Sequence, residues 1–186
     1  MLVGVLALQG AFIEQEKMLQ KLGADCIELR KKEDLEKGYD ALVLPGGEST
    51  VQGKLLRELD MFDTLQEQIQ SGMPVLATCA GMILLASELE NDTNTYFATI
   101  PMCVKRNAYG RQLGSFHTEA LLKNIGTVPM TFIRAPYVAY AKDDVDVLAT
   151  VNNKIVAVQY QNQIALAFHP ELDDNLSIHR YFLSLI

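Results

Sequence analysis

The stretch that decides the fold is Pro74–Ala86, which reads PVLATCAGMILLA. A short apolar run leads into a turn of small residues, a single cysteine, Cys79, stands at that turn, and an apolar segment with helical propensity follows. This order predicts a strand, a tight elbow and a helix, which is how α/β enzymes expose a nucleophile at the end of a strand. Amides at the helix N-terminus would stabilise a thiolate and could hold an oxyanion. The alternative is a buried structural cysteine, the commoner fate of a free thiol.

Strand-like and helix-like patterns alternate on both sides of this elbow. The first half predicts strands over residues 2–8, 25–29, 41–44 and 75–77, and helices over 12–22, 60–71 and 79–90. Such β–α alternation indicates a parallel sheet with helices on both faces. The second half predicts short strands over 97–104, 112–121, 130–134, 145–151, 154–160 and 163–168, with a closing helix over 173–185. Asn152-Asn153 and Gln161-Asn162 are typical of hairpin turns.

These elements predict an α/β fold with a mostly parallel central sheet flanked by helices and extended by antiparallel strands. No linker, internal repeat or low-complexity tract interrupts the sequence, so we expect a single domain over residues 1–186. The apolar run at 2–8 lacks a basic n-region and a cleavage site, which favours a first buried strand over a signal peptide.

Composition excludes several classes of function. The 186 residues are 49% apolar and 21% charged, with a net charge of −7, which argues against a basic nucleic-acid-binding face and against binding to an anionic membrane. No apolar run approaches the roughly 20 residues of a membrane-spanning helix. The three cysteines, Cys26, Cys79 and Cys103, form no C-x-x-C pair, so neither a disulfide framework nor a zinc site is expected, and the reducing cytoplasm is the expected compartment.

A candidate base follows the last predicted strand, in Phe168-His169-Pro170-Glu171. Glu171 stands two positions after His169 and could fix its tautomer and stabilise the imidazolium. The other two histidines, His117 and His179, have no carboxylate in so close a setting at a strand end. Cys79, His169 and Glu171 together predict nucleophilic acyl transfer.

The segment Pro45–Thr50, PGGEST, follows another predicted buried strand. Ligand sites of open α/β sheets lie at the carboxyl ends of strands, and glycines let backbone amides approach a substrate. An oxyanion-hole or substrate loop is therefore favoured. A plain βα turn with Ser49 or Thr50 as helix N-cap is the alternative. A phosphate loop is set aside, because Gly53-Lys54 is followed by Leu55 rather than Ser or Thr.

Two arginines remain open on the residues alone. Arg106 begins a polar loop, and Arg134 ends an apolar run. Either could pair with a substrate carboxylate or form a structural salt bridge.

The sequence resembles a known family, the glutaminase subunits of pyridoxal 5′-phosphate synthase. These subunits are class I (triad-type) glutamine amidotransferases. Five strings carry the resemblance in order: PGGEST (45–50), TCAG (78–81), RNAYGRQ (106–112), FIRAP (132–136) and FHPEL (168–172). It spans nearly the whole chain, from Leu8-Gln9-Gly10 to the final helix. The elbow and the His-Pro-Glu string are shared across class I glutaminases, whereas PGGEST and RNAYGRQ point to this subfamily.

The resemblance implies a specific chemistry and a flavodoxin-like three-layer fold. Cys79 would attack the side-chain amide of L-glutamine, His169 oriented by Glu171 would transfer the proton, and a γ-glutamyl thioester would be hydrolysed to L-glutamate. The backbone amides of Ala80 and Gly47 would form the oxyanion hole. It implies a glutamine site lined by Gly46, Gly47, Glu48, Arg106, Ile133 and Arg134.

The resemblance also implies a partner. Ammonia would pass to a pyridoxal 5′-phosphate synthase subunit, in a large hetero-oligomer with equal numbers of both subunits. Gln9 and Gly10 would lie at that contact and help to set the oxyanion hole. No cofactor and no metal are implied, because pyridoxal 5′-phosphate is a product of the complex.

The chain departs from the family at two places. Ala77 replaces the first glycine of the G-x-C-x-G elbow, which predicts a slightly tighter turn. Leu113-Gly114-Ser115-Phe116-His117 stands where the family has an aspartate and then Ser-Phe-Glu, which affects local contacts rather than the triad. Two alternatives remain. The first is another enzyme of the same fold, either a cysteine-elbow hydrolase or a glutaminase that serves another synthase. The second is a non-enzymatic scaffold subunit.

Overall fold

A computed structural model describes residues 1–90, 92–106 and 114–186 of the chain. Of the RNAYGRQ string only Arg106 lies within these residues. The string from 107 to 112 and Leu113 of the second departure lie outside them.

The centre of the fold is a parallel sheet. Its strands are β1 (Leu2–Leu6), β2 (Asp25–Leu29), β3 (Ala41–Leu44), β4 (Val75–Thr78) and β12 (Gln163–Leu166), in the spatial order β2-β1-β3-β4-β12. All neighbouring pairs in this block run parallel. Strands β3, β4 and β12 are buried along their whole length, as continuous apolar runs predict for a sheet covered on both faces.

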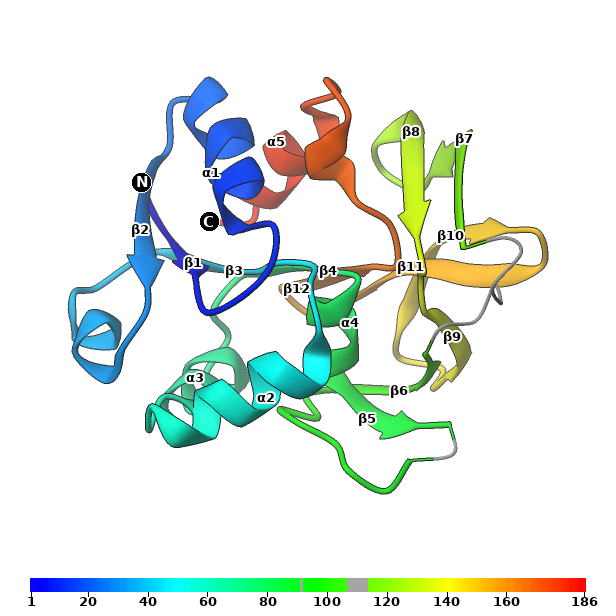
Figure 1. Ribbon diagram of the computed structural model, residues 1–186. Helices are drawn as coiled ribbons and strands as arrows, with labels where there is room; N and C mark the ends of the chain where they lie inside the picture. Colours follow the sequence, from blue (N-terminus) through cyan, green and yellow to red (C-terminus); the bar gives the residue numbers. More distant parts are fainter. Residues whose placement is uncertain (91, 107–113) are drawn as a thin grey trace.

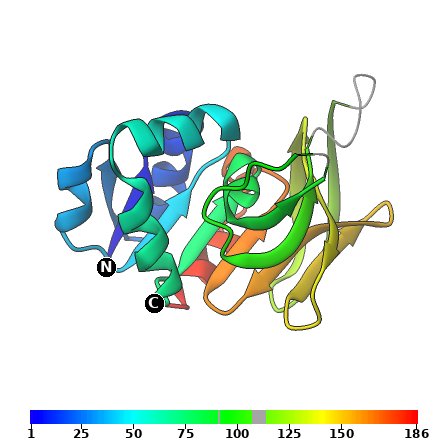
Figure 2. The same cartoon turned by 90° about the horizontal axis from the view of Figure 1, so that it is seen from below.

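Helices cover both faces of this sheet (Figure 1). The helix α1 (Phe12–Lys21) and the closing helix α5 (Ser177–Leu183) lie on one face, and α2 (Ser49–Glu58) and α3 (Phe62–Gln70) lie on the other. Figure 2 shows α2 and α3 in front of the sheet from below. Two short 3₁₀ turns, η1 (Lys32–Glu36) and η2 (Pro170–Leu172), complete the connections.

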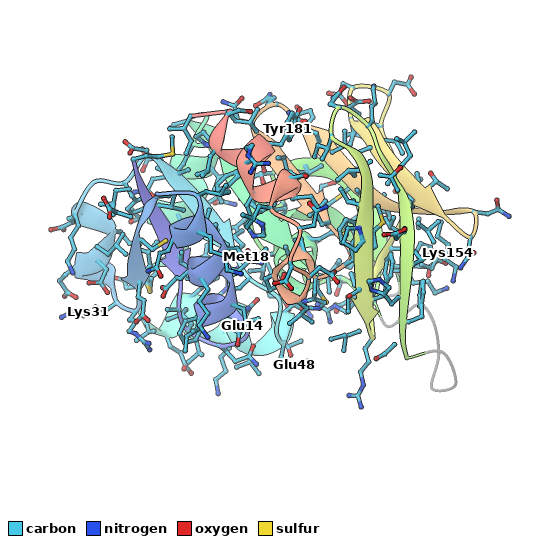
Figure 3. All side chains as sticks on the ribbon, turned by 90° about the horizontal axis from the view of Figure 1, so that it is seen from above. Glu14, Met18, Lys31, Glu48, Lys154 and Tyr181 are labelled. Carbon is cyan, nitrogen blue, oxygen red and sulfur yellow. The ribbon has the colours of Figure 1, made fainter. Side chains whose placement is uncertain are left out.

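Antiparallel strands extend the sheet beyond β12. They are β5 (Ala86–Leu89), β6 (Ile100–Lys105), β9 (Tyr137–Ala141), β10 (Asp146–Val151) and β11 (Lys154–Tyr160). The order continues β12-β11-β9-β6-β5, with β10 beside β11 and only the β5–β6 pair parallel. A separate hairpin joins β7 (Ser115–Leu122) to β8 (Gly126–Ile133). Figure 3 shows the length of this arrangement, with Lys31 and Lys154 at its opposite ends.

The predicted fold class is confirmed, and the turn predictions hold. Asn152 and Asn153 both have positive φ, 50° and 60°, as a tight hairpin turn between β10 and β11 requires. Gln161, with φ 52°, stands in the turn between β11 and β12.

Three elements differ from the predictions. The helix after the elbow, α4, covers only Ala80–Leu85 rather than 79–90, because Ala86–Leu89 leaves it to pair with β6 as a strand. Strand β9 was not predicted at all. The closing helix begins at Ser177 rather than at 173, after the 3₁₀ turn at Pro170–Leu172.

The register brings the candidate residues to one edge of the sheet. Leu44 of β3 lies beside Ala77 of β4, and Leu166 of β12 lies beside Thr78. The segments that follow these three strands therefore leave the sheet together. None of the helices within the described residues is long and apolar enough to cross a membrane.

Candidate active site

Cys79 stands in the backbone conformation expected of a nucleophile elbow. It has φ 50° and ψ −101°, a region that non-glycine residues rarely occupy, and it is the N-cap of α4. Its amide donates to the carbonyl oxygen of Leu166 at 2.7 Å, which joins the elbow to β12. A Cβ at Gly81 would overlap the carbonyl oxygen of Leu44, so this glycine lets α4 pack directly on the end of β3.

His169 and Glu171 form the expected pair. The Nδ1 atom of His169 lies 2.7 Å from Oε1 of Glu171, whose side chain is fully buried. Burial alone lowers the pKa of His169, but hydrogen bonds with Cys79 and Glu171 and their negative charges raise that pKa to about 10. Cys79 and His169 line the same cavity, so the predicted nucleophile, base and carboxylate lie together.

The loop Pro45–Glu48 packs against the histidine ring. A Cβ at Gly46 would overlap Cε1 of His169 and lie 3.5 Å from Cβ of Cys79, so only glycine fits at this position. The Gly46 amide donates to Oγ1 of Thr78 at 3.0 Å, and its carbonyl oxygen accepts from the Ala11 amide at 3.0 Å. The loop is thus fixed from both sides.

Gln9 holds the same loop further along. Its Oε1 atom accepts from the Glu48 amide at 2.7 Å, and its carbonyl oxygen accepts from Nε2 of Gln52 at 2.9 Å. The N-cap of α2 is Glu48 rather than Ser49 or Thr50, and the Glu48 side chain makes no capping hydrogen bond, so the predicted N-cap is wrong. In Figure 3, Glu48 and Glu14 of α1 lie at the same edge of the molecule.

A cavity of about 750 Å³ opens at this edge. Its lining contains eight of the residues that the sequence predicts: Gln9, Gly47, Glu48, Cys79, Arg106, Ile133, Arg134 and His169. Gly46, Gly10, Ala80 and Glu171 do not line it, because they lie behind the lining residues or beside them. Two more lining residues, Ser49 and Thr50, belong to the predicted substrate loop, and sequence reasoning missed three others: Ile83, Ser115 and Pro136. Ile83 lies one helical turn after Cys79, a spacing that could have revealed it.

The two arginines are held differently. Arg106 forms an ion pair with Asp92 at 3.2 Å and donates to the Tyr96 hydroxyl at 3.0 Å, so the structural salt bridge is present even though the side chain lines the cavity. Arg134 is exposed and has φ 44°, which turns the chain sharply at the end of β8. Its amide donates to the carbonyl oxygen of Gly114.

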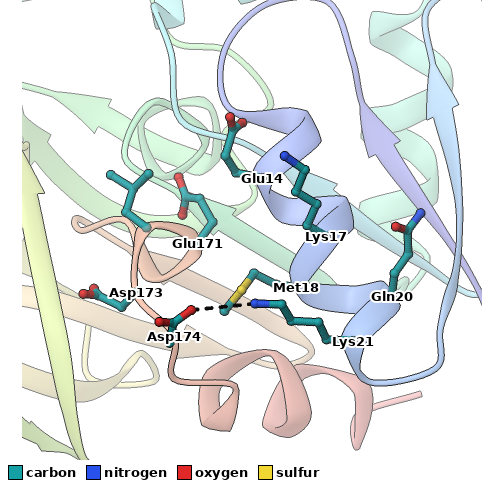
Figure 4. Close-up of a pocket in the computed structure, with 9 residues that line it drawn as sticks. Glu14, Lys17, Met18, Gln20, Lys21, Glu171, Asp173 and Asp174 are labelled. Carbon is teal, nitrogen blue, oxygen red and sulfur yellow. Dashed lines mark ion pairs between the residues drawn. The ribbon is translucent and has the colours of Figure 1, made fainter.

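A second cavity, of about 470 Å³, lies between α1 and the turn η2 (Figure 4). It is lined by Glu14, Lys17, Met18, Gln20, Lys21, Glu171, Leu172, Asp173 and Asp174. This set has carboxylates and amines but no nucleophile, so the chemistry belongs to the larger cavity. Within the described ranges, no cluster of three or more histidine, cysteine and acidic side chains could hold a metal ion.

Comparison with known proteins places this geometry in a family. The model of the SNO glutamine amidotransferase family matches residues 5–186. The chain belongs to this family. Among its members, the pyridoxal 5′-phosphate synthase subunit PdxT of Desulfitobacterium hafniense (strain DSM 10664 / DCB-2) is 63% identical over 186 residues, covering 100% of this chain and 94% of that protein. PdxT of Haemophilus influenzae (strain PittEE) is 53% identical, covering 100% and 98%.

A solved structure described as a glutamine amidotransferase agrees with the fold. It superposes with a TM-score of 0.93 at 41% identity, covering 98% of this chain and 97% of that one. The family assignment therefore rests on sequence and on backbone alike.

Proposed function

We propose that this chain is a glutaminase that hydrolyses L-glutamine to L-glutamate and ammonia and delivers the ammonia to a synthase subunit for pyridoxal 5′-phosphate (vitamin B6) biosynthesis. Membership of a glutamine amidotransferase family and the names of its full-length relatives support this function. The observation that carries it is a single cavity that brings Cys79 to His169, which is hydrogen-bonded to Glu171, beside a glycine loop at the end of a parallel sheet.

The catalytic roles follow from the atoms that face one another. Glu171 is hydrogen-bonded to Nδ1 of His169. The other ring nitrogen, Nε2, is therefore the atom that accepts the thiol proton of Cys79. The sulfur then attacks the side-chain carbonyl carbon of glutamine and forms a tetrahedral intermediate. His169 returns the proton to the nitrogen, the C–N bond breaks, and ammonia leaves a γ-glutamyl thioester. Water, deprotonated by His169, hydrolyses the thioester to glutamate and regenerates the thiol.

Backbone amides are proposed to hold the oxyanion. The Ala80 amide opens α4 beside Cys79, where amides of a helix start are unpaired. The Gly46 carbonyl oxygen accepts a hydrogen bond from the Ala11 amide. In a planar trans peptide the following N–H points the opposite way, so the Gly47 N–H is directed away from Ala11. Gln9 and Gly10 support this arrangement, because a Cβ at Gly10 would overlap the Gly46 carbonyl oxygen.

Substrate recognition is proposed for the charged and glycine residues of the large cavity. The carboxylate of Glu48 suits the α-ammonium of glutamine, and the guanidinium groups of Arg106 and Arg134 suit its α-carboxylate. Gly46, Gly47 and Ile133 would shape the space around the side-chain amide. Both charges of a free amino acid are thus matched within one cavity.

The proposal includes a partner and a compartment. The synthase subunit would bind at the edge that carries Gln9 and Gly10, in a hetero-oligomer with equal numbers of both subunits. Residues 1–186 would act as a single domain in the cytoplasm, where the free thiols of Cys26, Cys79 and Cys103 stay reduced.

The first measurement is glutamate release from L-glutamine by the chain alone and with its synthase subunit. We expect release to rise strongly when the subunit is present. Absence of release under both conditions would contradict the proposal.

Substitution of the nucleophile tests the chemistry. Cys79→Ala should abolish glutamine-dependent pyridoxal 5′-phosphate formation in the assembled complex, and added ammonium should restore it. Cys103→Ala removes another buried thiol, on β6, and should leave glutamine-dependent formation unchanged. Glutamine-dependent formation that persists in Cys79→Ala would reject the triad.

A further inference from the structure

A buried glutamine on α1 reaches the rear of the triad. Gln15 has no exposed surface, and its side-chain Nε2 atom donates to Oε2 of Glu171 at 2.9 Å. The same Nε2 lies 3.3 Å from Oγ1 of Thr78, and the Oε1 atom lies 2.8 Å from Nε2 of His179. A buried amide is costly unless it is hydrogen-bonded, so these partners specify the position of the side chain.

The chemistry of the partners fixes the direction of each hydrogen bond. A carboxylate only accepts, so the amino group of Gln15 must face Glu171 and its carbonyl oxygen must face His179. His179 then donates from Nε2. Burial lowers the pKa of His179 to about 4, so the ring is neutral near pH 7 and its single proton sits on Nε2. Its Nδ1 atom is buried and has no hydrogen-bond partner among the described residues.

Both carboxylate oxygens of Glu171 are therefore hydrogen-bonded. Oε1 meets His169 at 2.7 Å and Oε2 meets Gln15 at 2.9 Å, so the carboxylate cannot rotate without losing a bond. Its side chain is fully buried, where such charge-assisted bonds are strongest.

The same glutamine also touches the support of the glycine loop. Oγ1 of Thr78 accepts from Gln15 and from the Gly46 amide at 3.0 Å. One side chain thus contacts the group that orients the base and the hydroxyl that anchors the loop. Neither Gln15 nor His179 lines the large cavity, so neither touches a bound substrate.

We propose that Gln15, held in one orientation by neutral His179, is a positioning residue that keeps Glu171 and the Thr78-anchored loop in register. The proposal rests on the glutaminase function above. It assigns a task to two buried polar residues that the triad chemistry itself does not use.

The first test compares two buried glutamines. Gln15→Leu keeps a similar shape but removes all three hydrogen bonds, those with Glu171, Thr78 and His179. We expect kcat for glutamine, measured with the synthase subunit present, to fall about tenfold to hundredfold with KM changed less than twofold. Gln163→Leu is the matched control, because Gln163 is also buried and accepts from Oγ1 of Thr99 at 2.6 Å, at the start of β12 away from the triad. It should lower stability and leave kcat unchanged.

The second test addresses the anchor. His179→Leu removes the donor to Gln15 and should lower kcat, whereas His179→Gln retains an N–H donor of similar reach and should restore most of it. Because both residues act along one line of hydrogen bonds, the double variant Gln15→Leu/His179→Leu should lose no more than Gln15→Leu alone.

A third readout does not need turnover. The Nδ1 proton of His169, hydrogen-bonded to Glu171, should exchange with water about tenfold faster in Gln15→Leu and be unchanged in Gln163→Leu, as followed by proton NMR. Unchanged kcat and exchange in Gln15→Leu, equal losses in both glutamine variants, or losses that multiply in the double variant would each overturn the positioning role. Wild-type chain that releases no ammonia with its synthase subunit would reject the glutaminase function instead, and the exchange rates would still decide the positioning role.

Discussion

The pKa values of two buried histidines in this molecule are shifted in opposite directions. His169, after β12, and His179, in α5, are both at most 8% exposed. Burial lowers the pKa of each, yet that of His169 rises to about 10 whereas that of His179 falls to about 4. The difference lies in the partners. His169 meets the carboxylate of Glu171 and lies beside Cys79, whereas the one hydrogen-bond partner of the His179 ring among the described residues is the neutral carbonyl oxygen of Gln15.

The comparison shows that neighbouring charge, rather than depth, decides the protonation state of a buried imidazole. One histidine can therefore serve as a proton carrier and the other as a fixed neutral donor. Both lie on one line of hydrogen bonds through Glu171 and Gln15, so each can be converted toward the other by changing its partner.

The largest effect is expected from Glu171→Gln, which removes the negative charge beside His169. The pKa of His169 should fall from about 10 toward its ordinary value of 6.5, because the effect of Glu171 is lost while that of Cys79 remains. The kcat for glutamine should fall about 10³- to 10⁴-fold, as when the carboxylate of a catalytic triad is neutralised. NMR titration of the ring protons and glutamine turnover with the synthase subunit measure both changes.

Glu14→Gln is the control for that variant, because Glu14 lines the second cavity beside Glu171 without contacting His169. It should leave the titration of His169 and the turnover unchanged. A pKa that stays near 10 in Glu171→Gln would mean that Cys79 alone keeps the pKa of His169 raised.

Acid should weaken the fold through His179. The unfolded chain binds this proton near pH 6.5 and the folded chain near pH 4, so the unfolded state holds more protons between these values. The stabilisation is present above pH 6.5 and is lost as the pH falls toward 4, by about 3 kcal/mol. Urea unfolding of wild type and His179→Gln across this range should show a shallower loss in the variant, and parallel curves would contradict the lowered pKa.

The third prediction concerns the close packing of Gly46 against the His169 ring. Gly46→Ala would push a Cβ into the ring and displace the base, so kcat should fall about tenfold to hundredfold, the cost of a displacement of about 1 Å. Because the change does not touch the line from Gln15 to His179, the acid dependence of stability should be the same as in wild type. A Gly46→Ala enzyme with full activity would show that the loop yields to the new methyl group.

The smallest effect is expected at His117, the histidine outside the core. Its side chain is 54% exposed, with Nδ1 3.0 Å from Oγ1 of Thr131 and 3.8 Å from Asp173. His117→Gln should change the free energy of unfolding by less than about 0.5 kcal/mol, as is usual for a surface site. Kinetic assays should find kcat within twofold of wild type. A larger loss would mean that this departure from the family pattern reaches His169 through Thr131, whose carbonyl oxygen accepts from the His169 amide.

Local patterns were sufficient where an element is defined by its own residues. The apolar runs of β3 and β4, the turn at Asn152-Asn153 and the elbow at Cys79 were predicted within a residue or two. They failed where pairing with a distant strand decided the outcome. Ala86–Leu89 continues a helical pattern, yet becomes a strand because β6 offers its edge. Strand β9, YVAYA, was missed even though its tyrosines and valine favour a strand.

The sequence by itself determined the β–α alternation of the first half, the elbow that exposes Cys79, and the residues Cys79, His169 and Glu171, because each depends on a short run of neighbours. The tertiary structure alone decided which groups stand behind them. Gln15 and Glu171 are 156 positions apart, and Gln15 and His179 are 164 apart, so no local pattern could relate them. Only packing of α1 and α5 on the same face of the sheet brings these polar groups into a dry interior, where each must find a partner.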